Sequence, residues 1–133
     1  MYLKIIFPFV LLLFLFGCGK NAKDEALELN NGEKWKMNAE MMPPLEASGK
    51  LISAFAANDK KDYKSLAEKL KENNQLLISS CTMKGKSHDE LHKWLYPYMA
   101  LIDKLENAGD EKEANEVFLK IEQSFETFNQ YFQ

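Results

Sequence analysis

The clearest helical pattern in the chain is EKEANEVFLKIEQSFETFNQY, which spans residues 111–131. Its large apolar residues recur every three or four positions, a spacing that places side chains on one face of an α-helix. Asp110 precedes this run and Glu113 follows three residues later, a capping-box pattern that supplies acceptors for the first free N–H groups of a helix. The inward face is expected to consist of Ala114, Val117, Phe118, Ile121, Phe125, Phe128 and Phe132.

Three earlier segments have the same periodicity, at about residues 43–57, 60–83 and 87–107. A second capping box is expected from Ser87 to Glu90. The links between the segments are short, so neighbouring helices should run antiparallel. No segment alternates with a period of two, as a half-buried strand would. The sequence therefore predicts an all-α fold, an antiparallel up-down-up-down four-helix bundle, with Trp35 packed across one end as a lid.

The chain begins with the features of a secretory signal. One basic residue, Lys4, precedes an apolar run from Ile5 to Phe16 that is too short to span a bilayer as a helix. The run ends in Leu-Phe-Gly-Cys18, which resembles the lipobox of bacterial lipoproteins. This resemblance implies that residues 1–17 are a signal peptide and that Cys18 carries the lipid (palmitate among its acyl chains). The alternative is a membrane helix that is never cleaved, with Cys18 unmodified.

Three regions follow from this interpretation: the signal peptide at 1–17, the lipidated Cys with a flexible tether at 18–37, and the four-helix bundle at 38–133. The expected location is the cell envelope, on the periplasmic face or outer surface of a membrane. The basic residues number 17, all of them Lys, against 20 acidic residues, giving a net charge of −3. Nucleic-acid contacts favour Arg and a basic surface, so nucleic acid is not an expected partner. The expected partners are the membrane, through the lipid anchor, and another envelope protein.

One stretch, CTMKGKSHDELH at residues 81–92, contains every candidate metal ligand that we single out. Cys81 is the only thiol left once Cys18 is acylated, and Met83, His88 and His92 lie close by across the turn between the second and third helices. The two histidines are four residues apart, which places both rings on one helical face. Thiolate, thioether and imidazole form a soft ligand set that suits copper, Cu(I) especially, and zinc less selectively. Met41 and Met42 are expected at the opposite end of the bundle and are not counted.

The alternative to a metal site is a non-catalytic interaction or structural module. In that case Cys81 is a small buried hydrophobe, or it joins two chains by a disulfide, and the histidines are structural. Haem is not expected because the chain has no Cys-x-x-Cys-His motif. An enzyme is not expected either, because no acyl-binding pocket or orienting acid accompanies Cys81 and the histidines.

The stretch from Cys81 to Leu95, with its Cys-Thr-Met-x-Gly-x-x-His-Asp-x-Leu-His-x-Trp-Leu pattern, resembles a pattern in small envelope lipoproteins of Bacteroidota, most of them uncharacterised. The segment NNGEKWK at residues 30–36 and the aromatic ending Tyr131-Phe132 are similar too. The resemblance implies an envelope location and a helical domain. It implies no activity and adds no ligand.

Overall fold

The computed structural model describes residues 25–133, and this part of the chain folds into four helices. They are α1 (Met42–Ala57), α2 (Tyr63–Ser79), α3 (Lys86–Glu106) and α4 (Glu111–Tyr131), with a short 3-10 turn, η1 (Ala39–Met41), before α1. The prediction of an all-α, four-helix fold is confirmed. The predicted signal peptide and Cys18 lie outside the described residues. Within residues 25–133, no helix is both long and apolar enough to cross a membrane.

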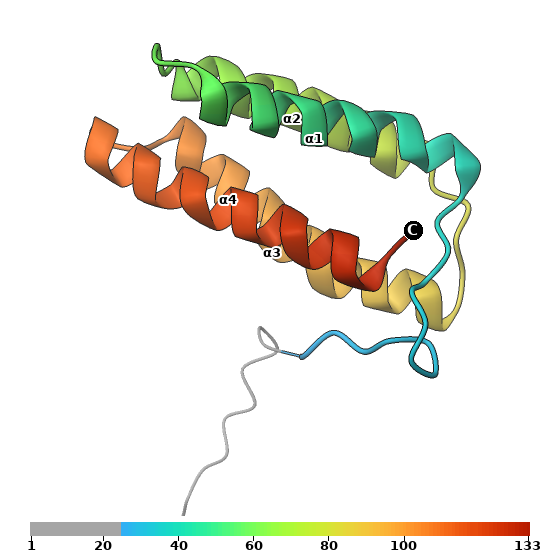
Figure 1. The fold of residues 1–133 in the computed structure, drawn as a ribbon. Coiled ribbons are helices and arrows are strands. Elements are labelled where there is room, and N and C mark those ends of the chain that lie inside the picture. The colour runs from blue at the N-terminus through green and yellow to red at the C-terminus, as the bar shows by residue number, and fades with distance from the viewer. Residues whose placement is uncertain (1–24) are drawn as a thin grey trace, which may run out of the picture.

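Each helix packs against the helix that follows it in the chain. Figure 1 shows successive helices running in opposite directions, with α1 and α2 forming one layer and α3 and α4 the other. The start of α1 and the link between α2 and α3 therefore lie at the same end, where the N–H of Thr82 donates to Asn38 Oδ1 at 3.2 Å. The expectation that Met41 and Met42 lie at the opposite end is wrong, because one helix out and one helix back return the chain to its starting end.

The predicted apolar faces form the core between the two layers. All seven residues expected on the inward face of α4 and its end are buried. Trp94 of α3 stacks on Tyr98, with ring centroids 4.7 Å apart, and packs against Phe128 of α4 at the same separation. Aromatic pairs in such arrangements add to the stabilisation that comes from the buried area itself.

The helix starts follow local chemistry at two of the three interior boundaries. Asp62 and Asp110 cap α2 and α4, and Asp110 Oδ1 accepts the N–H of Glu113 at 2.8 Å, as predicted. The predicted capping box at Ser87 is wrong. The helix α3 begins one residue earlier, after Gly85, whose φ of +68° suits glycine. The Ser87 hydroxyl instead donates to a backbone carbonyl of the preceding link.

The second helix is shorter than the predicted 60–83 at both ends. It stops at Ser79, where the hydroxyls of Ser79 and Ser80 both donate to the carbonyl oxygen of Leu76. The Ser80 hydroxyl also donates, at 3.1 Å, to the carbonyl oxygen of Leu77, which would accept the N–H of Cys81 if the helix continued. As a result, Cys81 and Met83 lie in the link to α3 and not on α2.

Residues 25–37, which we call the strap, cross one end of the bundle. The backbone of Trp35 pairs with the C-terminus: its N–H donates to Tyr131 at 2.8 Å, and its carbonyl accepts the N–H of Gln133 at 2.9 Å. The Trp35 side chain is buried, and its indole N–H donates to the Glu28 carbonyl at 2.7 Å. The predicted lid is confirmed, but this part of the predicted flexible tether is fixed to the bundle.

Candidate binding sites

The two histidines form a pair on the first turns of α3. The ring centroids of His88 and His92 are 4.0 Å apart, and both side chains are half-buried. The Nδ1 atom of His92 lies 3.2 Å from the hydroxyl of Tyr96, one turn further along. Burial lowers the pKa of His92, and the neighbouring His88 lowers it further, while Asp89 opposes the shift. His92 is therefore biased toward the neutral form that binds metals.

The two sulfur residues lie on the link before this pair. Cys81 and Met83 are half-buried and pack against the edge of the hydrophobic core. Across residues 25–133, no group of three or more His, Cys, Asp or Glu side chains is close enough together to hold a metal ion. The structure thus brings the two histidines together but does not group Cys81 with them. The predicted ligand set of Cys81, Met83, His88 and His92 stays a prediction.

Glu90 is a buried carboxylate that the sequence reasoning placed in the Ser87 capping box or, as an alternative to Asp89, beside an imidazole N–H that it would orient. It is 2% exposed, and it accepts hydrogen bonds from Lys93 Nζ at 2.8 Å and from the N–H of Glu28 at 2.9 Å. Burial alone would raise the pKa of Glu90, but these two hydrogen bonds and the charges of Lys93 and Lys86 hold it below its ordinary value. Glu90 therefore fastens the strap to α3.

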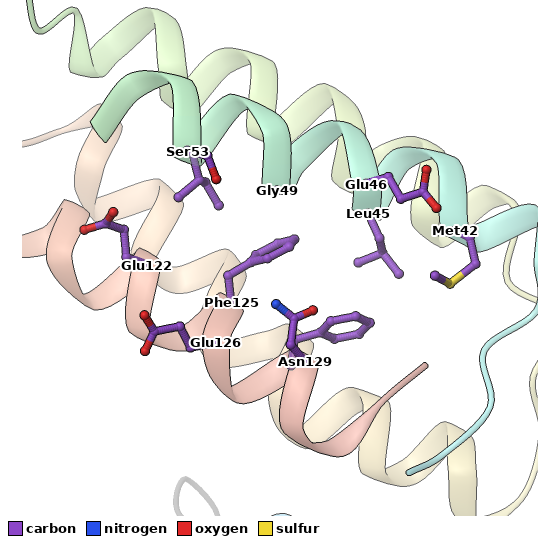
Figure 2. A pocket seen from close by; sticks show the side chains of 11 residues that line it. Met42, Leu45, Glu46, Gly49, Ser53, Glu122, Phe125, Glu126 and Asn129 are labelled. Carbon is purple, nitrogen blue, oxygen red and sulfur yellow. The ribbon is translucent and has the colours of Figure 1, made fainter. Parts of the chain in front are cut away.

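A groove with a volume of about 330 Å³ lies between α1 and α4. These two helices are the first and last of the bundle, and they are not among the closely packed pairs. Figure 2 shows Leu45 and Phe125 pointing into the space between them, with glutamates along its edges. The apolar wall is formed by Leu45, Ile52, Phe125 and Phe128, and the acidic edge by Glu46, Glu122 and Glu126.

Gly49 occupies the middle of the α1 wall. A Cβ atom built there would lie 3.2 Å from Cε1 of Phe125, closer than most such contacts. The missing side chain lets the Phe125 ring approach the α1 backbone. A glycine inside a predicted helix is a signal of close packing that sequence reasoning could have used.

Sequence reasoning missed this groove, since the periodicity places the glutamates on the solvent face and does not reveal that the backbones of α1 and α4 are more widely separated than those of successive helices. No protein-family model, curated protein or solved structure matches the chain.

Proposed function

We propose that the chain is a non-catalytic lipoprotein of the bacterial cell envelope, anchored through Cys18, whose bundle binds another molecule. The anchor is supported by the apolar leader and the Leu-Phe-Gly-Cys18 sequence. The binding role is supported by the α1–α4 groove, which combines an apolar wall with a charged edge, as ligand and partner sites commonly do.

The strap gives the proposal a mechanical basis. Trp35 is paired with the C-terminus, and Glu28 is bonded to buried Glu90. Lys93 reaches the strap as well, 3.7 Å from the carboxylate of Glu25. A domain fastened in this way is held in one orientation relative to residue 25, which follows the proposed lipid at Cys18 by seven residues.

The anchor is tested by labelling cells with an alkyne analogue of palmitate. The wild-type chain and Cys81→Ser, the matched control at the second cysteine, should both be labelled and recovered with the membranes. Cys18→Ser should lose the label and remain as an unprocessed precursor. Label retained by Cys18→Ser would overturn the proposal.

The second candidate function is soft-metal binding at the turn before α3, favoured by the 4.0 Å separation of the His88 and His92 rings. Copper as Cu(I) is the metal proposed, with Cys81 and Met83 as sulfur ligands, because these donors match its softness. Binding would require the link carrying the sulfurs to shift toward the histidines.

The reduced chain is titrated with Cu(I) against a competing chelator. A variant combining Cys81→Ser, His88→Ala and His92→Ala should lose the affinity that wild type shows. Met99→Leu, which changes a methionine further along α3, is the matched control and should bind as wild type does. Equal binding by wild type and the triple variant would exclude the site.

A further inference from the structure

We propose that the groove between α1 and α4 binds a basic amphipathic helix of a partner protein. This inference rests on the proposed binding role and adds the chemistry of the partner. Helices that dock in grooves insert apolar side chains spaced three and four residues apart, and their flanking charges set the orientation.

The apolar part of the groove matches such side chains. Leu45 and Ile52 contribute from α1, Phe125 and Phe128 from α4, and all four are core residues that are less than a tenth exposed. They belong to the hydrophobic core, yet they border an open space of about 330 Å³. That volume lies near the lower limit of ligand pockets, which suits a few projecting side chains better than a large cofactor.

The charges at the edge select a basic occupant. Glu46 lies on the α1 side, while Glu122 and Glu126 lie one turn apart on the α4 side (Figure 2). No lysine lines the groove, and none of these three carboxylates forms a salt bridge to any residue between 25 and 133. Like charges facing one space repel, and lysine or arginine side chains on an inserted helix would relieve that repulsion.

The dimensions are those of a short helix. The lining runs from Met42 to Ser53 on α1 and from Glu122 to Asn129 on α4. At 1.5 Å per residue these walls are roughly 16 Å and 10 Å long, or about two to three helical turns. A partner would therefore insert apolar residues at positions i, i+3 or i+4, and i+7.

The test uses the full chain in phosphatidylcholine nanodiscs and a fluorescent, end-blocked peptide of Leu and Lys with that apolar spacing. The peptide carries a photo-cross-linker on its apolar face. Binding is followed by anisotropy, with empty nanodiscs as the blank, and cross-links are mapped by mass spectrometry. A Leu and Glu peptide of the same pattern is the charge control. We expect the Leu and Lys peptide to bind and to cross-link to residues 42–53 and 122–129.

The matched variants are Glu122→Gln with Glu126→Gln, and Glu68→Gln with Glu72→Gln. Both pairs remove two charges one helical turn apart, but Glu68 and Glu72 are exposed on α2, away from the groove. The groove pair should weaken binding about three- to tenfold, which lies within the range for two exposed ion pairs, and added salt should shrink the difference. The α2 pair should change it less than twofold.

Several results would overturn the inference. They are equal binding of the acidic peptide, equal weakening by the α2 pair, or cross-links outside α1 and α4. Binding of a small cation such as benzylammonium without binding of the peptide would reassign the groove to a small ligand. Dimers seen by light scattering and abolished by the groove variants would reassign it to a second copy of the chain. None of these results bears on the lipid at Cys18, so the anchor and the groove are judged separately.

Discussion

Replacing Tyr98 with phenylalanine should stabilise the protein. Tyr98 is fully buried in the middle of α3, and its hydroxyl has no hydrogen-bond partner among the described residues. Burial raises the pKa of Tyr98 far above its ordinary value, an effect that nearby Ser48 offsets only in part. Ser48 lies near enough to the Tyr98 hydroxyl to lower its pKa, and the Ser48 hydroxyl also accepts a hydrogen bond from Asn73 at 3.1 Å. The Tyr98 hydroxyl is therefore a polar group removed from water without adequate compensation.

A buried hydroxyl left unpaired costs about 1–3 kcal/mol. Tyr98→Phe removes that group and keeps the ring that stacks on Trp94 at 4.7 Å. The small void left behind returns part of the gain, so we expect the free energy of unfolding to rise by about 1 kcal/mol. For a domain of this size Tm should rise by about 4 °C.

The measurement is thermal and urea denaturation followed by circular dichroism. Tyr96→Phe is the matched control on the same helix, because Tyr96 is 60% exposed and its hydroxyl meets only His92. That control should stay within about 0.5 kcal/mol of wild type. A lower Tm for Tyr98→Phe would show that the hydroxyl has an effective partner, such as Ser48 or a buried water, and would refute the reasoning.

Three further predictions follow from the packing and the strap. Because the pKa of Glu90 is lower in the folded protein, the ionised carboxylate contributes its full stability above the ordinary pKa of 4.5 and loses it as pH falls through the lower folded pKa. Tm measured from about pH 6 to pH 3 should therefore fall less steeply in Glu90→Gln than in wild type. Parallel curves for the two proteins would contradict this prediction. Phe128→Ala should lower the free energy of unfolding by about 3–5 kcal/mol in urea titrations, because it empties a buried site beside Trp94; a loss below about 1 kcal/mol would show that the groove collapses to fill it. Trp35→Ala should release the strap, so limited proteolysis should cut residues 25–37 faster while the helical dichroism is kept, whereas unchanged cleavage would mean that Glu90 holds the strap alone.

The helices were predictable because apolar side chains repeat every three or four residues and pack into one core. The predicted α4 coincides with the observed Glu111–Tyr131. The errors in the helix bounds lie at the helix ends, where apolar periodicity gives no information. The apolar pattern of α2 continues through Cys81, but the Ser80 hydroxyl donates to the Leu77 carbonyl that another turn would need.

The candidate sites were less predictable, because they depend on which helix backbones are widely separated and on the directions in which side chains point. The spacing alone predicted that His88 and His92 lie close together, since residues four positions apart on a helix are neighbours on one face. Whether Cys81 reaches them depends on the path of the link, which no local pattern specifies. The groove arises from the separation of α1 and α4, a property of the whole bundle.

The pairing of Trp35 with the last residues of α4 determines how load passes through the molecule. A pull applied upstream of residue 25 would reach the strap first, and from there the last residues of the chain through three backbone hydrogen bonds, before α1 is stretched. Peptides added after Gln133 would crowd the backbone pairing between the strap and the last residues of the chain. Reporter tags are better inserted in the exposed link at Asn58–Asp59, at the far end of the bundle (Figure 1).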